Sequence, residues 1–307
     1  MLFSVLLPAY KSVFLKECIE SILNQTITDF ELIIVDDCSP HAIDEIISEF
    51  TDSRISYYKN ETNIGAEHLV NNWNYCLQKA NGEFFIMMGD DDRMEPNYLE
   101  EFLGLINKYP HLDVYHCRSI IINEESTAIG LTPSWPEFES VYENIWHRLM
   151  GFRLQYISDF VYRKKSFVKN GGFFYLPLAW GADDITSYIA CGNKGIAHSN
   201  NPVFNYRKSQ YTISNTSSYS KKIEAIILRQ QWFDKFLLMP PEGEIDKIYW
   251  QNIRDMLGNK MQQMKIQEVA GFFKKRNIKH FFIVYYKRKQ FLLSRKDILK
   301  AMLLSFR

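Results

Sequence analysis

Three consecutive aspartates, Asp90, Asp91 and Asp92 (the aspartate triplet), are the residues of this sequence best suited to chemistry. They follow the apolar run 84–88 and precede Pro96, so we expect them where a buried strand ends. Carboxylates this close repel one another unless a cation joins them, and Mg²⁺ or Mn²⁺ carrying a substrate phosphate prefers oxygen ligands. The pattern therefore predicts a metal-assisted enzyme that acts on a phosphorylated donor. An acidic turn whose Asp92 caps the next helix is the alternative.

Short β-branched runs alternate with helical periods over residues 1–120, which predicts a mainly parallel sheet flanked by helices. The expected strands are 3–8, 30–35, 54–59, 83–88 and 112–117, and the expected helices are 13–25, 42–50, 66–80 and 96–109. Ligands of such sheets bind beyond the carboxyl ends of the strands. We therefore expect Tyr10, Asp37 and the aspartate triplet to meet at one edge. Alternatively, Asp36 and Asp37 only cap the following helix.

The sequence lacks the glycine-rich loops that bind phosphate through backbone N–H groups. No Gly-x-Gly-x-x-Gly turn follows the first expected strand, and no Gly-x-x-x-x-Gly-Lys-Ser/Thr loop occurs. A metal ion is therefore expected to hold the phosphates. The same absence disfavours a sugar nucleotidyltransferase, which would need a basic, glycine-rich loop where this chain has Pro8-Ala9-Tyr10-Lys11.

Length and composition are those of an ordinary globular enzyme. The 307 residues are 46% hydrophobic, enough for one large core with an appended helical part.

The five cysteines are widely spaced and never form Cys-x-x-Cys, which disfavours disulfides and zinc and fits a reducing cytoplasm. The apolar opening lacks a basic leader, and no stretch reaches about 18 uninterrupted apolar residues, so we expect neither secretion nor a membrane span.

The net charge of zero hides a basic C-terminal tail. Residues 271–307 contain eleven Lys and Arg and a single acidic residue, Asp297, with apolar and aromatic runs at 281–286 and 291–293. That composition is typical of a segment that lies on an anionic membrane surface. A tail folded against the acidic body of the enzyme is the alternative. Nucleic acid is not an expected partner, because no recognition motif accompanies the tail.

Several motifs occur in order, and together they resemble family 2 inverting glycosyltransferases of the GT-A fold. The motifs are Ser4-Val5-Leu6-Leu7-Pro8-Ala9-Tyr10, Ser21-Ile22-Leu23-Asn24-Gln25-Thr26, Phe30-Glu31-Leu32-Ile33-Ile34-Val35-Asp36-Asp37-Cys38-Ser39, Asn63-Ile64-Gly65, Ala80-Asn81-Gly82-Glu83-Phe84 and the aspartate triplet. A weaker match continues through Gly171-Gly172-Phe173 to Trp180-Gly181-Ala182-Asp183-Asp184, which is similar to the family's Gly-Glu-Asp segment. The last third of the chain has no counterpart.

The resemblance implies a nucleotide pocket. Pro8, Tyr10 and Asp37 would line it, with Asp37 accepting a hydrogen bond from a base N–H group. That contact favours uracil and hence a UDP-sugar, although guanine offers similar donors. Independently of the family, Arg207 and Lys208 begin a Ser/Thr-rich loop that is suited to bind the donor diphosphate, or else remains a solvated basic loop.

The resemblance also implies the metal ligands. Asp91 and Asp92 would face the donor ribose and the metal, Mg²⁺ or Mn²⁺, with Asp90 beside them in the donor site. The family's usual Asp-x-Asp-Asp is Gly89-Asp90-Asp91-Asp92 here, which leaves open which carboxylate binds the metal. The glycine that usually follows the aspartates of the second strand is replaced by Cys38.

Sugar transfer by a single displacement also needs a base for the acceptor hydroxyl. Asp183 stands at the third position of the Gly-x-Asp segment and is the expected catalytic base, with Asp184 as the alternative. Both could instead simply begin a helix. Trp180 could pack under a sugar ring or belong to the core, and His198 is expected to be structural.

The sequence therefore predicts a metal-dependent hexosyl- or N-acetylhexosaminyl-transferase that extends a glycan or lipid-linked acceptor in surface polysaccharide biosynthesis. We expect a GT-A domain at 1–219, with a nucleotide-binding half at 1–120 and an acceptor half at 121–219. A helical extension is expected at 220–307, its basic tail beginning near 271, with a cytoplasmic location, peripheral on the inner face of the membrane. Because two motifs are imperfect, a catalytically silent relative that binds sugar nucleotide or glycan is the alternative.

Overall fold

The computed structural model describes residues 1–210, 218–274 and 278–306. The chain divides into two compact units. Met1–Tyr175 and Ala182–Thr212 form the first, and Leu176–Gly181 and Ile213–Arg307 form the second. A short internal segment therefore belongs with the C-terminal helices. The domain boundary that we expected between 219 and 220 stays a prediction.

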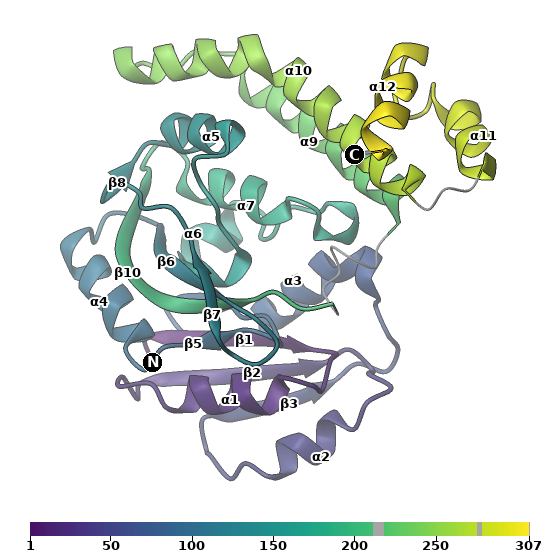
Figure 1. Cartoon of the computed structure of the whole chain (residues 1–307). Coiled ribbons are helices and arrows are strands. Elements are labelled where there is room, and N and C mark those ends of the chain that lie inside the picture. The colour runs from purple at the N-terminus through teal and green to yellow at the C-terminus, as the bar shows by residue number, and fades with distance from the viewer. Residues whose placement is uncertain (211–217, 275–277, 307) are drawn as a thin grey trace. The chain divides into compact units, whose positions relative to one another are not determined.

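The first unit contains a sheet and the helices that cover it (Figure 1). Its strands are β1 (Phe3–Ala9), β2 (Phe30–Asp36), β3 (Ile55–Lys59), β4 (Phe84–Met87), β5 (Arg93–Met94), β6 (Val114–Ile122), β7 (Ala128–Leu131), β8 (Phe138–Glu139), β9 (Phe160–Arg163) and β10 (Ile196–Arg207). Its helices are α1 (Leu15–Leu23), α2 (Ile43–Ser48), α3 (Leu69–Lys79), α4 (Tyr98–Lys108), α5 (Val141–Met150), α6 (Lys164–Lys169) and α7 (Ala182–Cys191), with short 3-10 turns at Ala66–His68 and Ile157–Asp159.

The described strands form one mixed sheet in the order β3-β2-β1-β4-β9-β6-β10-β5, with β7 beside β6 and β8 beside β10. Strands β1 to β4 pair in parallel, and so do β6 and β10. Strand β9 runs antiparallel to both β4 and β6 and joins the two parallel parts. The predicted fold class, a mainly parallel sheet flanked by helices and followed by a helical extension, is confirmed.

Strands β1, β2 and β4 are buried on both faces, which explains their unbroken apolar runs, whereas edge strand β3 is only half-buried. Side chains alternate along a strand, so Phe3 and Leu7 of β1 pack in one cluster with residues of α1, α2 and α4. On the opposite face Phe85 of β4 contacts Phe167 and Phe173, with ring centroids 4.8 and 5.9 Å away. Separate groups of apolar side chains thus cover the two faces of the sheet.

The sequence patterns located these elements well. The four expected helices and five expected strands of residues 1–120 all form, with ends that differ by a few residues. The fifth strand is longer than expected, because it continues to Ile122 while paired with β10 and β7. Strand β9 was missed, since a four-residue run carries too little periodicity to predict a strand.

The second unit is helical. Its helices are α9 (Tyr219–Phe236), α10 (Glu244–Phe273), α11 (Ile278–Lys287) and α12 (Arg295–Ser305), with a 3-10 turn at Pro177–Ala179. A separate core of residues from all four helices holds them together, among them Ile223, Val269, Val284 and Ile298. None of the helices in the described part of the chain combines the length and apolarity needed to cross a bilayer.

We expect Gly82 to be required at the start of β4 for steric reasons. A Cβ atom there would lie 2.7 Å from the backbone of Phe3 and Ser4, which the sheet holds in place. Gly82→Ala should therefore lower the free energy of unfolding by about 1–3 kcal/mol in urea denaturation. Gly104→Ala is the matched control, because Gly104 is exposed on helix α4 with open space around it, and should raise stability by up to about 1 kcal/mol. Equal effects of the two substitutions would contradict the steric explanation.

Candidate active site

The carboxyl ends of β1, β2 and β4 are joined by hydrogen bonds at Tyr10. The Tyr10 carbonyl accepts a bond from Ser39 Oγ just beyond β2 (2.6 Å), and its N–H donates to Asp90 Oδ2 just beyond β4 (2.9 Å). Pro8 is half-buried, whereas Tyr10 is 42% exposed and presents its ring to solvent. Three of the predicted site segments therefore meet at one sheet edge, as the parallel strands require.

Lys11, to which no motif assigned a role, lies among the aspartates. Its N–H donates to Asp90 Oδ2 (2.7 Å), and its Nζ lies 3.2 Å from Asp90 Oδ1 and also pairs with Asp91. Burial opposes the lysine charge, but Asp90 and Asp91 outweigh it and raise the pKa of Lys11 above its usual value. The Asp90 carboxylate, bonded to backbone and lysine, holds the end of β1 to the end of β4. The adjacency of Lys11 to Tyr10 in the sequence was the signal that could have identified it.

Asp92 is buried and bonded to two distant segments. Its Oδ1 accepts from the Arg207 N–H (2.9 Å), and its Oδ2 accepts from Ser158 Oγ (3.4 Å). Burial, and then the charge of Asp91, raise the pKa of Asp92 well above its usual value. A Cβ atom on Gly89 would lie 2.6 Å from Asp92 Oδ2. The glycine that departs from the family motif thus makes room for this carboxylate.

Arg207 supports the aspartate triplet from inside the fold. Its side chain is fully buried: Nε donates to the Asp91 carbonyl (2.7 Å), one terminal nitrogen to Glu17 Oε2 (2.7 Å) and the other to the Asn123 carbonyl (3.0 Å). The guanidinium also lies over the Phe14 ring, 4.2 Å from its centroid. The guanidinium could bind the diphosphate of a sugar nucleotide only if it first left these partners. In this structure Arg207 therefore supports the triplet.

Asp37 is buried at the end of β2, and its carboxylate is already bonded to its own chain. Oδ1 accepts from Asn60 Nδ2 (2.8 Å) and the Ile64 N–H (2.9 Å), and Oδ2 accepts from Asn63 Nδ2 (3.1 Å) and the Gly65 N–H (3.2 Å). Asp37 therefore orders the turn at 63–65, which the sequence singled out as a motif without a stated function.

Asp183 and Asp184 begin helix α7 and differ in their surroundings. Asp184 is 2% exposed, and its Oδ1 accepts from Arg148 Nε and Gln155 Nε2, both at 2.9 Å. Asp183 is half-buried. Burial opposes the charge of Arg148, but Asp184 and then Asp183 raise the pKa of Arg148 further above its usual value. The guanidinium therefore fixes the start of α7. Sequence patterns missed Arg148 and Gln155 because they lie far from α7 in the chain.

A stacked pair of tyrosines connects the aspartate triplet with the start of α7. The rings of Tyr156 and Tyr206 are parallel within 6°, with centroids 3.7 Å apart. Tyr206 precedes Arg207, which binds the triplet, and Tyr156 follows Gln155, which binds the start of α7. Burial raises the pKa of Tyr206 to about 12, assisted by the charges of Asp92, Asp91 and Asp183. The stack therefore links the residue beside a support of the triplet to the residue beside a support of α7.

Two further residues that the sequence singled out have contacts of their own. Trp180 belongs to the second unit, where Lys222 Nζ lies 4.2 Å from the centroid of its ring. His198 is buried, stacks on Trp135 with centroids 4.8 Å apart, and has a lowered pKa because of burial. Of the loop that begins at Arg207 and was expected to bind the donor diphosphate, the residues from 211 onward lie outside the described residues.

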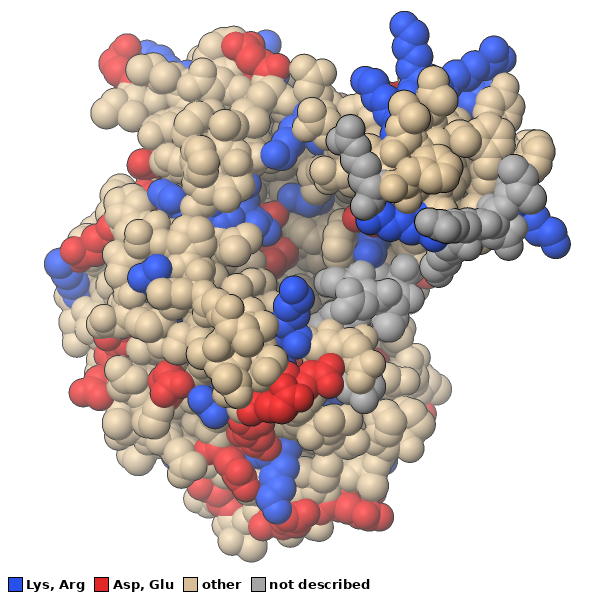
Figure 2. Space-filling model, in the orientation of Figure 1, with Lys and Arg blue, Asp and Glu red and all other residues tan. Residues whose placement is uncertain are grey.

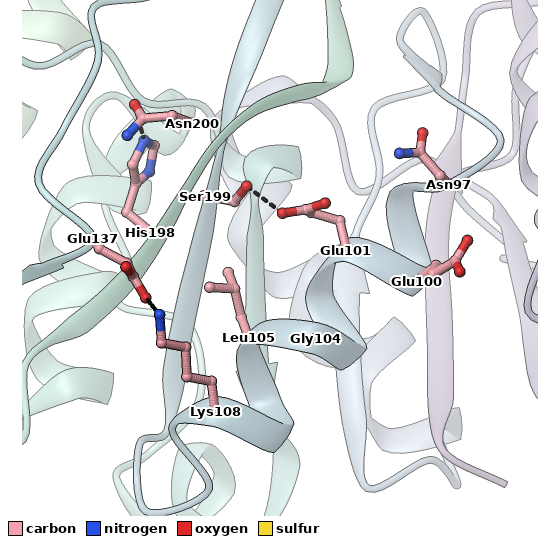
Figure 3. A pocket seen from close by; sticks show the side chains of 10 residues that line it. All are labelled: Asn97, Glu100, Glu101, Gly104, Leu105, Lys108, Glu137, His198, Ser199 and Asn200. Atoms are coloured by element: carbon pink, nitrogen blue, oxygen red, sulfur yellow. Dashed lines mark hydrogen bonds and ion pairs between the residues drawn. The ribbon is translucent and has the colours of Figure 1, made fainter.

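A cleft of about 660 Å³ lies far from this site, between α4 and the first half of β10 (Figure 3). Its walls carry Glu101, which accepts a hydrogen bond from Ser199, and Lys108, which pairs with Glu137. The aspartate triplet contacts the other end of β10. We assign the cleft no part in the chemistry of the triplet.

The aspartate triplet has the composition of a site for a hard divalent cation. Its carboxylate oxygens are the ligands that Mg²⁺ and Mn²⁺ prefer. Burial is the main cause of the raised pKa values of Asp90 and Asp92, and the charge of Asp91 adds to both. A bound cation would favour the ionised forms. Asp91 is the least buried member of the triplet.

The chain belongs to glycosyl transferase family 2, whose family model matches residues 4–170. It spans only 39–55% of the length of the first curated relatives that it matches. Over a longer stretch, 75% of this chain and 84% of the relative, it is 26% identical to the Escherichia coli UDP-Glc:alpha-D-GlcNAc-diphosphoundecaprenol beta-1,3-glucosyltransferase WfgD.

Solved structures show the same GT-A fold. The structure of S. aureus TarS 1-349 in complex with UDP-GlcNAc is 16% identical and superposes with a TM-score of 0.67 over 100% of this chain and 91% of that one. The mannosyltransferase PcManGT from Pyrobaculum calidifontis, in complex with GDP-Man and Mn²⁺, is 14% identical with a TM-score of 0.55 over 99% and 86% of the two chains. The predicted family and fold are confirmed.

The internal position of Arg207 predicts a stability effect. Arg207→Met should lower the free energy of unfolding in urea by roughly 2–4 kcal/mol, less than for a fully buried ion pair because Glu17 remains partly solvated. Lys208→Met removes the same charge from an exposed neighbour and should change stability by less than about 0.5 kcal/mol. An Arg207 variant as stable as the wild type would show that the guanidinium does not support the fold.

Proposed function

We propose that this chain is an inverting glycosyltransferase that transfers a sugar from a nucleoside diphosphate sugar to a hydroxyl of a glycan or lipid-linked acceptor. The observation that supports this proposal most directly is the stack of Tyr156 on Tyr206. Tyr206 directly precedes Arg207, whose N–H binds Asp92, and Tyr156 directly follows Gln155, which binds Asp184. The stack therefore connects the supports of the two acidic groups within one unit. Membership of the family fits this arrangement.

For the donor, Asp91 and Asp92 are the proposed metal ligands, and Asp91 is the more accessible. Mg²⁺ or Mn²⁺ bound there would stabilise the charge of the leaving diphosphate. The exposed ring of Tyr10, together with Pro8, would pack against the base. Asp37 would accept a hydrogen bond from a base N–H group, or would order the turn at 63–65 that contacts the base. UDP is the favoured nucleotide, and the UDP-GlcNAc complex of TarS supports that choice. The GDP-Man complex of PcManGT keeps guanine as the second candidate.

For the acceptor, Asp183 is the proposed base. It is less buried than Asp184, whose Oδ1 is bonded to Arg148 and Gln155. In one displacement the acceptor oxygen bonds to the anomeric carbon, the bond from that carbon to the diphosphate oxygen breaks, and the acceptor proton passes to Asp183. The anomeric centre is inverted. Asp184 would position Asp183 by anchoring the start of α7 to Arg148.

Two alternatives remain open. A catalytically silent relative would bind the donor without transfer, and the imperfect Gly181-Ala182-Asp183-Asp184 segment motivates that hypothesis. A sugar nucleotidyltransferase is less favoured, because the first strand leads into Pro8-Ala9-Tyr10-Lys11 and not into a glycine-rich loop. The silent relative differs from the enzyme in one measurable way, since it forms no product with metal, donor and acceptor together.

Calorimetric titration with UDP and GDP, with and without Mn²⁺, tests the proposed donor site. Wild type and Asp183→Asn should both bind UDP in a metal-dependent manner, whereas Asp91→Asn/Asp92→Asn should lose the metal-dependent part. Turnover of Asp183→Asn should fall by about 10²–10⁴-fold with binding retained. Asp184→Asn is the comparison for the base: a larger fall in its turnover at unchanged stability would transfer the role to Asp184. Absence of metal-dependent binding of either nucleotide would contradict the proposal.

We also propose that the second unit attaches the enzyme peripherally to the inner, cytoplasmic face of an anionic membrane, where a lipid-linked acceptor of surface polysaccharide assembly would be found. The relative WfgD, whose name specifies a diphosphoundecaprenol-linked acceptor, supports this kind of substrate. Figure 2 shows Lys and Arg side chains projecting from the region that Figure 1 labels α11 and α12. All five cysteines are unpaired, which fits a reducing compartment.

Helices α11 and α12 each carry two apolar faces. The inner face of α11 contributes Val284 to the helical core, while its outer face exposes Phe282 (63%), Ile283 (42%) and Tyr286 (87%) beside exposed Lys287. A helix that only packed on its own protein would carry polar residues on that outer face. An apolar strip edged with lysine matches the boundary between acyl chains and anionic headgroups.

Helix α12 repeats this arrangement. Ile298 and Ala301 are buried in the core, whereas Leu299 (58%) and Leu303 (62%) are exposed on the outer face. Exposed Arg295, Lys296 and Lys300 border these leucines. The single acidic residue of α12, Asp297, is bonded to Ser294 and Gln262, so three positive charges on this helix stand against one negative charge. We call the exposed side chains of α11 and α12 the basic apolar face.

Vesicle sedimentation tests the basic apolar face. Binding should require phosphatidylglycerol in phosphatidylcholine vesicles and weaken with salt, and Phe282→Ser/Tyr286→Ser should lower affinity roughly tenfold or more. Leu238→Ser/Met239→Ser is the matched control, because both side chains are 77% exposed but lie beside Glu242 and Glu244. Equal binding to vesicles with and without phosphatidylglycerol, or equal losses in the two variants, would contradict the assignment.

A further inference from the structure

Lys11 is fixed at its backbone, whereas its side chain is only half-buried. The N–H groups of Tyr10 and Lys11 both donate to Asp90 Oδ2, at 2.9 and 2.7 Å, which holds the end of β1 in place. The Lys11 ammonium reaches back to Asp90 Oδ1 (3.2 Å) and to Asp91. Its side chain is nevertheless 25% exposed. The ammonium group can therefore leave the carboxylates by rotation about side-chain bonds, while the strand end keeps its position.

The contacts of the aspartate triplet make Asp91 the carboxylate for which Lys11 and a metal ion compete. Asp90 is bonded to two backbone N–H groups, and Asp92 is buried against the Arg207 N–H. Asp91 is more exposed than either, and Lys11 is the partner of its Oδ2. An ammonium group at that oxygen repels a divalent cation that approaches the same carboxylate. Metal binding to the free enzyme is therefore opposed by Lys11.

We propose that Lys11 is a built-in counter-ion, which neutralises Asp91 in the free enzyme and moves to the donor diphosphate when metal and donor bind together. The inference rests on the proposed function, because it concerns the same donor site. Once the metal has taken Asp91, the diphosphate oxygens supply the negative charge that the ammonium needs. Lys11 thereby couples the two ligands: it opposes the metal alone and favours the metal with a diphosphate.

Two titrations on the full chain test this role, and the inference requires that they change in opposite directions. Mn²⁺ binding without nucleotide is measured from the electron paramagnetic resonance signal of the free ion, and UDP binding with Mn²⁺ by calorimetry. Lys11→Met should bind Mn²⁺ alone roughly threefold more tightly or better, and UDP with Mn²⁺ roughly threefold more weakly or worse. Lys11→Arg keeps the charge and should remain near wild type in the first titration.

Lys16→Met is the matched control, because it removes one positive charge from an exposed lysine that pairs with Glu49. It should change neither titration. Unchanged or weaker binding of Mn²⁺ alone by Lys11→Met, or equal behaviour of the Met and Arg variants, would overturn the inference, and a thermal melt of each variant confirms that it is folded. Failure of the wild type to bind UDP with Mn²⁺ would count against the proposed function instead, since the titration with metal alone decides separately whether Lys11 competes for Asp91.

Discussion

Repulsion among three adjacent carboxylates at the end of β4 is the constraint on which the rest of the site depends. The chain satisfies each of them differently. The backbone that follows β1 binds Asp90, the Arg207 N–H at the end of β10 binds Asp92, and the ammonium of Lys11 binds Asp91. These contacts tie two other strands, β1 and β10, to the end of β4. Because the oxygens are held by groups from separate strands, the acidic edge is a property of the sheet and not of the loop alone.

Two arginines, the buried Arg207 and the half-buried Arg148, extend this support to distant segments. The Arg207 guanidinium joins the triplet to Glu17 of α1 and to Asn123 beyond β6, and the Arg148 guanidinium joins α5 to Asp184 of α7. An arginine is suited to both positions, since it stays charged when buried and offers several donors in one plane. The two acidic sites are therefore held by two separate arginines. The stacked pair formed by Tyr156 and Tyr206 lies between the supports of these sites.

Helices α11 and α12 of the second unit each carry apolar residues on two faces. Each of α11 and α12 must bury one apolar face to hold the helical core, as Val284 and Ile298 do. A second apolar face on the same helix is exposed to water unless a membrane or another partner covers it. The lysines beside that face stay solvated, which allows the unit to exist both in water and on a membrane surface. The helices thus serve packing with one set of positions and the proposed membrane contact with another.

The sequence by itself determined the order of strands and helices in residues 1–120, the edge at which Tyr10, Asp37 and the aspartate triplet meet, and the family. These features are local or periodic, and alternation of apolar residues and the positions of strand ends express them directly. Site contacts made across the chain could not be predicted in this way. Only the tertiary structure decided that Lys11 neutralises Asp91, and that Arg207 turns inward while its N–H binds Asp92. It also decided that the segment 176–181 joins the C-terminal helices. The physical reason is that such contacts are set by register and packing among strands far apart in sequence, and no pattern along the chain encodes which partner a buried charge will find.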